Sequence, residues 1–226
     1  MKLNIIYEDN TLLVVHKPAG LPAQTKQHSK KDLETEVRNY LLEKNDYKQT
    51  PYCAMIHRLD QPVEGLMLFA KTKQAAAILS ADLNAQSSEK RYLAITKSPL
   101  PAKEGTLTNY LCKNPTTNTS YVSDDSQKNA KKAVLDYKLS AQSDGHYLYE
   151  IRLHTGRHHQ IRVQLSHAGA PILGDNKYGQ GEAGMQPALC AYRLTFLHPV
   201  TKKKMTFSTR PENTVFQIFT DIEQIL

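Results

Sequence analysis

Charged side chains stand just before an apolar run in the segment HRLDQPVEGLMLFAKT, from His57 to Thr72. Asp60 lies five residues before the apolar run that begins at Gly65, and Pro62 stands between them. Proline lacks an amide N–H and restricts the residue before it, so we expect a fixed loop that can aim Asp60 into a cleft. By residue type alone, a turn hydrogen bond is the more common role of such an aspartate.

A second carboxylate, Glu64, lies close to Asp60. Glycosidases place two carboxylates across the scissile bond of their substrate. Both carboxylates here belong to one loop, so the glycosidase hypothesis is the weaker one. Arg58, two residues before Asp60, can pair with it or reach a phosphate, although surface arginines are common.

Two side chains elsewhere suit a site built around one ionised carboxylate. Arg162 is predicted on a short helix in RHHQIRVQLSHAG, and an arginine opposite Asp60 would hold that carboxylate ionised. Tyr92 directly follows Lys90 and Arg91, and a tyrosine presented from a strand can stack on a nucleobase. The plain alternatives are an exposed helix arginine and a core tyrosine.

The net charge of +7 is unevenly distributed. Between Glu150 and Arg210, nine Lys and Arg residues face three acids, so this stretch carries +6. Such a concentration suits a polyanion, because each neutralised phosphate releases counterions. A solvated basic surface is the equally weighted alternative from charge alone.

Several classes of protein and site do not fit the composition. The three cysteines are an odd count without CxxC spacing and the nine histidines form no HExxH, which argues against a disulfide framework and a zinc site. No apolar run approaches the roughly 20 residues of a membrane span. Glu8 and Asp9 interrupt any signal-peptide pattern, so we expect a cytoplasmic protein.

The elements that must position these residues are strands and amphipathic helices. IIYEDNTLLVVHKPAGLP predicts two short strands around a turn, and Pro18 ends the second. Residues 31–44 have apolar side chains at helical spacing, which predicts an amphipathic helix. Residues 65–70 are apolar on both faces, which predicts a central strand, and Thr72 is a candidate N-cap for the next helix.

The rest of the chain is richer in strand patterns. Further strands are predicted at 91–96, 147–153, 193–197 and 204–208. Residues 114–132 are expected to form an exposed loop with a hairpin tip, and Gly169 to follow the helix in RHHQIRVQLSHAG as its C′ residue. We therefore expect one α+β domain over residues 1–226, with a mixed, largely antiparallel sheet and flanking helices.

Together and in this order, these segments resemble the RluA-like family of RNA pseudouridine synthases over nearly the whole chain. The matching pieces are IIYEDNTLLVVHKPAGLP, HRLDQPVEGLMLFAKT, KRYLA, TGRHHQIRVQLSHAGAPILGDNKYG and RLTFLHP. The HRLD and GR-x-HQIR…GD…YG blocks are specific motifs. The resemblance implies the pseudouridine synthase fold with a central active-site cleft. It also implies isomerisation of uridine to pseudouridine in structured RNA, either tRNA or rRNA, without metal or organic cofactor.

The resemblance also implies residue roles. Asp60 matches the catalytic aspartate, Tyr92 the tyrosine that packs against the target base, and Arg162 the arginine that pairs with the aspartate. The residues expected to bind the substrate are His57, Arg58, Arg157, Gln160 and Leu194. Breaking an N-glycosidic bond develops positive charge on the sugar, which one ionised carboxylate suits. Whether Asp60 attacks the sugar or takes a proton from it stays open.

The sequence departs from the family pattern at Val63-Glu64, where Thr-Ser is frequent, and at His158, where GRTHQIR has threonine. A buried or cleft-facing Glu64 would lie close to the active loop and to RNA phosphates and alter substrate choice; the alternative is that it points to solvent. Many members carry an N-terminal S4 RNA-binding domain, which this sequence does not show, so we expect RNA affinity and target choice to come from the catalytic domain or from a partner. A monomer is the default expectation. The alternatives are an RNA-binding module of the same fold with weak or lost catalysis and, more remotely, a glycoside or nucleoside hydrolase.

Overall fold

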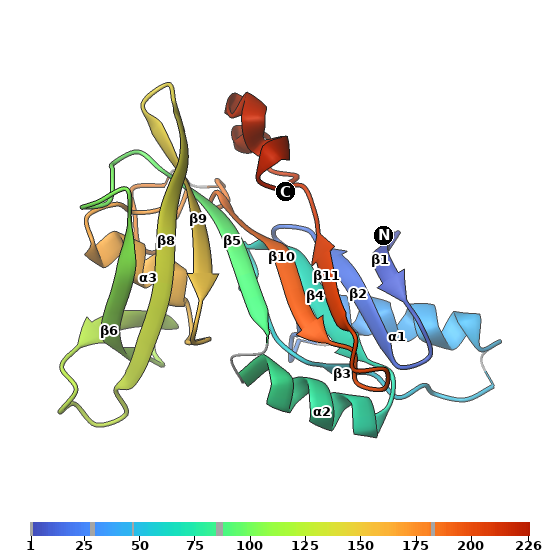
Figure 1. Ribbon diagram of the computed structural model, residues 1–226. Helices are drawn as coiled ribbons and strands as arrows, with labels where there is room; N and C mark the ends of the chain where they lie inside the picture. Colours follow the sequence, from blue (N-terminus) through green and yellow to red (C-terminus); the bar gives the residue numbers. More distant parts are fainter. Residues whose placement is uncertain (1, 28–29, 47, 85–87, 182–183) are drawn as a thin grey trace. The chain divides into compact units, whose positions relative to one another are not determined.

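The computed structural model describes residues 2–27, 30–46, 48–84, 88–181 and 184–226 (Figure 1). The chain divides into two compact units. Unit 1 consists of Met1–Glu89 and Ala191–Glu212, and unit 2 of Lys90–Cys190 and Asn213–Leu226. The expectation of one domain stays a prediction.

Unit 1 is built on buried strands. Its strands are β1 (Asn4–Glu8), β2 (Leu12–Lys17), β3 (Ala54–Met55), β4 (Glu64–Ala70), β11 (Lys204–Ser208) and most of β10 (Leu189–Leu197). The order is β1-β2-β4-β10, with β3 also pairing β4 and β11 also pairing β10. Every residue of β2 and β4 is buried, which confirms the central strand predicted after the HRLD loop.

Two helices complete unit 1, α1 (Leu33–Lys44) and α2 (Lys73–Asn84). Helix α1 begins two residues later than predicted because Asp32 is its N-cap, accepting a hydrogen bond from the Thr35 amide at 2.8 Å. The Thr72 hydroxyl accepts from the Ala75 amide at 3.1 Å, so the predicted cap of α2 is confirmed. The α2 face packs on the strands in one apolar cluster of Leu12, Val14, Leu66, Leu68, Ala70, Ala75, Leu79, Leu83, Leu194 and Phe196.

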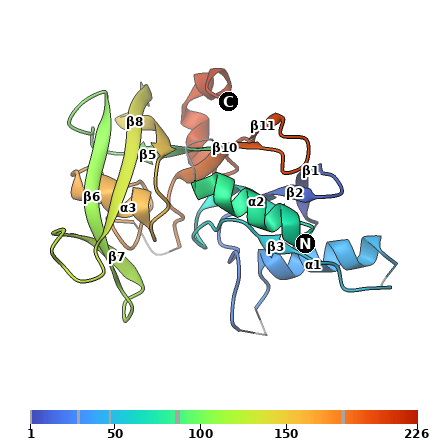
Figure 2. The ribbon, with the colours of Figure 1, turned by 60° about the horizontal axis from the view of Figure 1, so that its bottom comes forward.

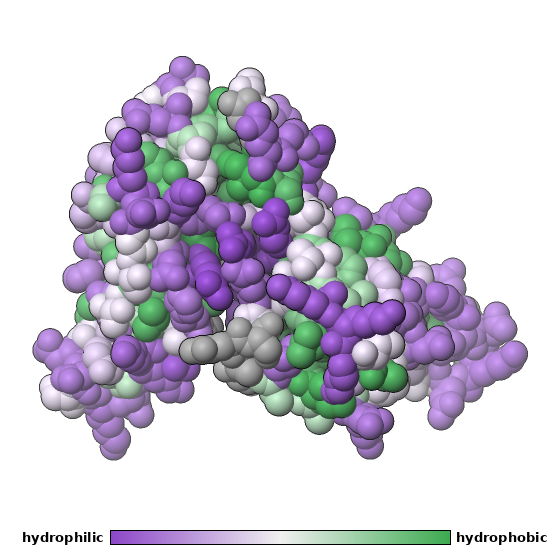
Figure 3. Space-filling model, in the orientation of Figure 1, coloured by the Kyte–Doolittle hydropathy of each residue, from purple (hydrophilic) through white to green (hydrophobic). Residues whose placement is uncertain are grey.

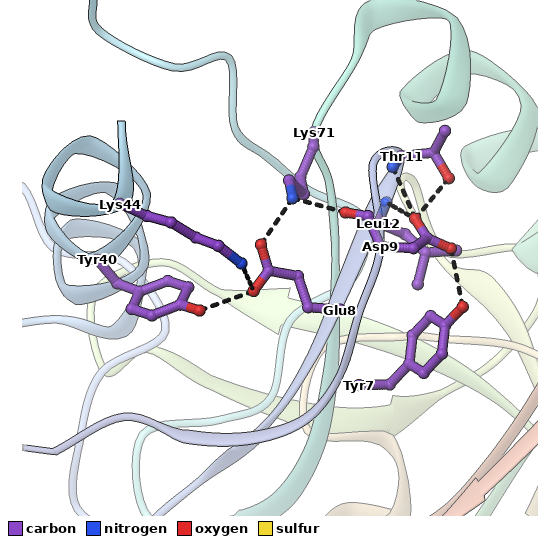
Figure 4. Close-up of polar contacts among 8 residues, drawn as sticks. All are labelled: Tyr7, Glu8, Asp9, Thr11, Leu12, Tyr40, Lys44 and Lys71. Atoms are coloured by element: carbon purple, nitrogen blue, oxygen red, sulfur yellow. Dashed lines mark hydrogen bonds and ion pairs between the residues drawn. The ribbon is translucent and has the colours of Figure 1, made fainter. Parts of the chain in front are cut away.

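The predicted turn between β1 and β2 is fixed by Asp9. Its carboxylate accepts from the amides of Thr11 at 2.7 Å and Leu12 at 2.9 Å, as Figure 4 shows. The same carboxylate lies 2.9 Å from the ring of His198, just after β10. Burial would raise the pKa of Asp9, but these hydrogen bonds lower it. The first and last of the motif segments are therefore joined inside unit 1.

Unit 2 is a curled run of antiparallel strands with one helix against it (Figures 1 and 2). The strands are β5 (Glu89–Thr96), β6 (Glu104–Asn114), β7 (Thr119–Ser123), β8 (Lys131–Ser143) and β9 (His146–Leu153). Their order is β5-β9-β8-β6-β7, and α3 (Gln160–His167) packs against β6 and β7. Two short 3₁₀ helices, Thr214–Ile218 and Thr220–Gln224, follow near the C-terminus.

The predicted loop at 114–132 is wrong in part. Its hairpin tip is confirmed between Asn114 and Thr119, but the segment also contains β7 and the start of β8. Only Ser120 is fully buried in β7, so the strand lacks an apolar pattern and depends on backbone pairing with β6. Strand β6 was also not predicted from the sequence.

The α+β class and the largely antiparallel pairing with flanking helices are confirmed. Hydrophilic residues cover much of the face seen in Figure 3, with smaller hydrophobic patches between them. Among the residues that the structure describes, no helix has the length and apolar character needed to cross a membrane.

Candidate active site

Asp60 lies in unit 1 on the loop that joins β3 to β4. The Val63 amide donates to the Asp60 carbonyl at 3.0 Å, which closes the predicted turn at Pro62. The next residue, Gln61, is bonded twice to Gly20, with its carbonyl accepting at 2.9 Å and its side-chain amide donating at 3.0 Å. Asp60 itself is half-buried. The loop is therefore fixed through its main chain, and Asp60 keeps part of its surface exposed.

A buried lysine holds the same loop from inside unit 1. Lys17, at the end of β2, is 0% exposed, and its ammonium donates to the carbonyls of Pro18, Leu21 and Gln61 at 2.9, 2.9 and 3.0 Å. Burial lowers the pKa of Lys17 to about 8, although the charges of Asp60 and Glu64 act to raise it. No role for Lys17 was predicted from the sequence. The feature that could have indicated one is a cation at the end of an apolar strand.

Gly65 and Glu64 set the junction between the loop and β4. Gly65 has φ +124°, and a Cβ there would collide with the main chain of Ala191 on β10, so the motif requires glycine. Glu64 is 2% exposed and accepts a hydrogen bond from the Glu212 amide at 2.8 Å. The solvent-facing alternative for Glu64 is therefore wrong.

His57 and Arg58 begin the motif with different environments. His57 is half-buried, and its Nε2 accepts from the Leu68 amide of β4 at 3.2 Å. Arg58 is exposed, which suits a side chain that contacts a polyanion. The observed contact of His57 supports the loop, and substrate binding by either residue stays a prediction.

Arg162 lies in unit 2 on α3, where it is 3% exposed. Its Nε and one terminal nitrogen each donate to a different oxygen of Asp175 at 2.8 Å, and its guanidinium carbon lies 5.2 Å from the centre of the Tyr178 ring. Such a two-point pair fixes the plane of the guanidinium and leaves other N–H donors of the group. The Asp60–Arg162 pair stays a prediction.

The turn before α3 is held by Gln160 and His159. The Gln160 side-chain oxygen accepts from the Thr155 hydroxyl at 2.7 Å and the Arg157 amide at 3.0 Å. His159 has a left-handed φ of 53°, and its Nδ1 lies 2.7 Å from the Tyr178 hydroxyl. Burial, followed by the charge of Arg162, lowers the pKa of His159 to about 3, so the ring is neutral.

The other predicted site residues lie in contrasting surroundings. Tyr92 is 7% exposed on β5, opposite Ile151 of β9. Arg157 is exposed, with its Nε donating to the Lys132 carbonyl at 2.9 Å. Leu194 lies on β10 in the apolar cluster of unit 1. Contacts of Tyr92, Arg157, Gln160 and Leu194 with a substrate stay predictions.

Asp175 and Tyr178 explain the GD…YG part of the second motif, to which sequence reasoning gave no role. Besides Arg162, the Asp175 carboxylate accepts from the amides of Lys177 at 3.0 Å and Tyr178 at 3.3 Å. The Tyr178 hydroxyl accepts from the Ser120 amide at 2.6 Å. Hydrogen bonds within the motif therefore immobilise Arg162. The spacing of the GD and YG pairs in the sequence was the signal that could have predicted this role.

The chain is similar to known proteins. Residues 11–167 match the family described as RNA pseudouridylate synthase. The uncharacterised RNA pseudouridine synthase YhcT of Bacillus subtilis is 34% identical over 206 residues, which are 88% of this chain and 66% of that protein. Ribosomal large subunit pseudouridine synthase D of Xanthomonas campestris is 33% identical over 215 residues, 88% of this chain and 63% of that protein. The chain thus spans about two thirds of these relatives.

The fold has solved counterparts. Human RNA pseudouridylate synthase domain containing 4 aligns with a TM-score of 0.78 at 22% identity, covering 97% of this chain and 93% of that chain. The corresponding human domain containing 1 protein gives 0.76 at 21% identity, covering 97% and 87%. These likenesses confirm the predicted fold, and the matched family residues include the whole HRLD loop. The chain belongs to the RNA pseudouridylate synthase family.

Proposed function

We propose that this protein isomerises uridine to pseudouridine in structured RNA, with Asp60 as the catalytic carboxylate. The carrying observation is the loop of Asp60, which is fixed by Lys17 and Gly20 while its carboxylate stays half-buried. A reacting group needs this combination of accessibility and fixed position. Membership of the RNA pseudouridylate synthase family supports the same reaction.

The reaction breaks the bond between C1′ of the ribose and N1 of the uracil, and it forms a bond from C1′ to C5. After the base has turned and the C1′–C5 bond has formed, C5 releases its proton to solvent and N1 takes up one proton from solvent, so the reaction is balanced. An ionised Asp60 acts at the sugar, where positive charge develops as the N-glycosidic bond breaks. Tyr92 packs against the base, and Arg162 supplies the cation that pairs with Asp60. The buried pair with Asp175 supports this role, because it fixes the direction of the Arg162 guanidinium.

The proposed substrate is large-subunit ribosomal RNA, with tRNA as the alternative. Two relatives, from Xanthomonas campestris at 33% identity and from Buchnera aphidicola at 32% identity, are named ribosomal large subunit pseudouridine synthase D. The excess of basic residues between 150 and 210 suits phosphate binding. Arg58 and Arg157 are exposed cations of the two motifs that can contact RNA. We propose that the protein acts as a cytoplasmic monomer.

The Asp60→Asn variant tests the catalytic assignment. Ribosomal RNA transcribed with uridine tritiated at C5 releases tritium when pseudouridine forms. We expect Asp60→Asn to lower release by at least about 10³-fold, because the reacting carboxylate is lost. RNA binding should change by less than about threefold, since one charge among many phosphate contacts is removed. Asp124→Asn, at an exposed residue, is the matched control. Tritium release by Asp60→Asn near the wild-type rate would refute the assignment.

The second candidate is an RNA-binding module with weak or lost catalysis, which the departure at Val63-Glu64 motivates. The same assay separates the two functions. A module would bind the transcript and release no tritium even as the wild-type chain. Mapping the pseudouridines lost from the ribosomal RNA of a deletion strain then identifies the target uridine.

A further inference from the structure

Three side chains from distant parts of the sequence converge inside unit 1. They are His16 on β2, Glu64 at the start of β4 and Glu212 after β11. The His16 Nε2 lies 3.8 Å from a Glu64 oxygen and 3.7 Å from a Glu212 oxygen. One nitrogen and two carboxylate oxygens all lie within 4.8 Å of one another. Mixed nitrogen and oxygen donors at this spacing are the ligand set of a divalent cation.

The other ring nitrogen of His16 fixes how the imidazole faces this cluster. Its Nδ1 lies 2.8 Å from the Thr209 hydroxyl, and that hydroxyl donates to the Arg210 carbonyl at 3.5 Å. In the tautomer with an Nδ1–H, the ring donates to this hydroxyl and the Nε2 carries a lone pair. Metal-binding histidines commonly donate their second nitrogen to an oxygen in this way.

The Nε2 of His16 is a buried polar atom without a hydrogen-bond partner within the described part of the chain. The side chain is 1% exposed, and Glu64 beside it is 2% exposed. A buried polar nitrogen without a partner destabilises the fold by roughly 1–3 kcal/mol. A cation between the orphan nitrogen and the facing carboxylates would satisfy all three groups.

A metal ion satisfies this geometry better than a proton. A proton on Nε2 would have to bridge 3.7 and 3.8 Å, whereas N–H···O bonds span about 2.7–3.2 Å. A zinc ion about 2.0–2.2 Å from each ligand atom places tetrahedral ligands about 3.3–3.6 Å apart. To complete the site, the two His16 distances must close by up to about half an ångström, and the two carboxylate oxygens, which lie within 4.8 Å of each other, by up to about 1.5 Å. Glu212, whose side chain is 54% exposed, can supply that movement and the route of entry.

We propose that His16, Glu64 and Glu212 bind one divalent first-row transition ion, with Zn²⁺ as the best match to one imidazole and two carboxylates. Water would complete the tetrahedral shell. The role is structural, because the ion would tie β2 and β4 to the segment after β11. Glu64 begins the strand that follows the Asp60 loop, so the ion also braces that loop. This assignment gives a function to the residue that departs most from the family motif.

Zinc titration of the full chain tests the site without any activity measurement. Protein stripped with a chelator is titrated with ZnCl₂ by calorimetry, and its thermal midpoint is recorded with and without zinc. We expect one high-affinity equivalent and a rise in the midpoint that grows with zinc concentration. Glu212→Gln should weaken zinc affinity at least about tenfold and remove most of the rise. Glu43→Gln, an equal charge change at an exposed residue of α1, should leave both unchanged.

Exposed histidines also bind zinc weakly, so a second measurement tests whether the ion lies at His16. In a ¹⁵N-labelled sample, the Nε2 resonance of His16 should move to the metal-bound range on adding one equivalent of zinc. The proposal is overturned if no stoichiometric binding occurs, if Glu212→Gln and Glu43→Gln bind zinc alike, or if the His16 resonance stays in place. Because Glu212 is partly exposed and distant in sequence from the HRLD loop, its variant is expected to fold.

Discussion

The two units hold their motif residues in opposite ways. In unit 1, the loop of Asp60 is held through carbonyls and amides, and Lys17 contributes three hydrogen bonds to the main chain. In unit 2, Arg162 is held directly by its side chain, through a buried pair with Asp175. Asp60 stays half-buried, whereas Arg162 and Asp175 are 3% and 0% exposed.

The difference follows from what each group is proposed to do. A carboxylate that reacts must stay accessible, and Asp60 is half-buried while its loop is fixed through the main chain. A cation that only sets charge and direction can be buried, provided that a carboxylate offsets its desolvation. The contrast predicts that substitutions in unit 2 act mainly on stability, while those below the Asp60 loop act mainly on rate.

The strongest test of this contrast is Asp175→Asn. It removes the carboxylate that pairs with Arg162 in unit 2, and breaking a buried pair destabilises by about 3 kcal/mol or more. For a chain of this size we expect a fall of about 6–12 °C in the thermal midpoint. Urea unfolding gives the free energy, with Asp124→Asn at an exposed residue as the control. A loss below about 1 kcal/mol would mean that the pair does not fix Arg162.

Lys17→Met tests the other side of the contrast. Losing a desolvated cation partly offsets the three lost hydrogen bonds, so we expect only about 1–2 kcal/mol of destabilisation. The Gln61 carbonyl loses a donor next to Asp60, so kcat should fall about tenfold or more. Single-turnover rates at saturating RNA measure this effect, with Lys30→Met at an exposed residue as the control. An unchanged kcat would show that Lys17 does not position the loop.

Glu8 gives a pH test confined to unit 1. Figure 4 shows its carboxylate with Lys44, Lys71 and Tyr40, at 2.8, 2.7 and 2.7 Å. Burial would raise the pKa of Glu8, but these three hydrogen bonds lower it to about 2.

A lowered carboxylate pKa stabilises the fold above the ordinary value of 4.5, and this stabilisation disappears as pH falls toward 2. At pH 7, Glu8→Gln should lower the free energy of unfolding by about 1–2 kcal/mol, after allowing for the exposure of Lys44. The difference from wild type should shrink between pH 4.5 and 2. A difference independent of pH would exclude the ion pairs as its source.

His158→Thr should have the smallest effect. The ring of His158 stacks on His159 with centroids 3.8 Å apart, and its Nδ1 lies 2.9 Å from the Ser120 hydroxyl. Threonine is the family residue here and keeps a hydroxyl, so we expect about 0.5 kcal/mol of destabilisation and unchanged kcat. Thermal unfolding and the tritium assay measure the two quantities. A tenfold loss of kcat would place His158 in the catalytic machinery.

The sequence predicted elements well where apolar patterns were strong. Strands β2 and β4 and helix α2 were expected from continuous or helically spaced apolar residues, and their positions are confirmed. Strands β6 and β7 were missed because polar side chains interrupt their patterns, and pairing partners hold them in place. Backbone pairing with neighbouring strands leaves no periodic signal in either β6 or β7.

The motif residues were predicted from the resemblance, but their supports were not. Lys17 acts on Gln61, 44 positions away, and Asp175 acts on Arg162, 13 positions away. The cluster of His16, Glu64 and Glu212 spans most of the chain, so no metal-binding spacing could appear in the sequence. Each of these contacts depends on strands that bring distant residues together, which a linear pattern does not record.

Unit 1 consists of two separate segments of the chain, and this has a consequence during synthesis on the ribosome. Strand β4 pairs with β2 and, at its C-terminal end, with β3 early, but its neighbour β10 follows roughly 120 residues later, which takes about 6–24 seconds at ordinary elongation rates. During this time an apolar strand edge stands open in the nascent chain, and such edges invite pairing with other chains. We expect nascent chains that stop before Ala191 to need chaperones, and the finished protein not to need them.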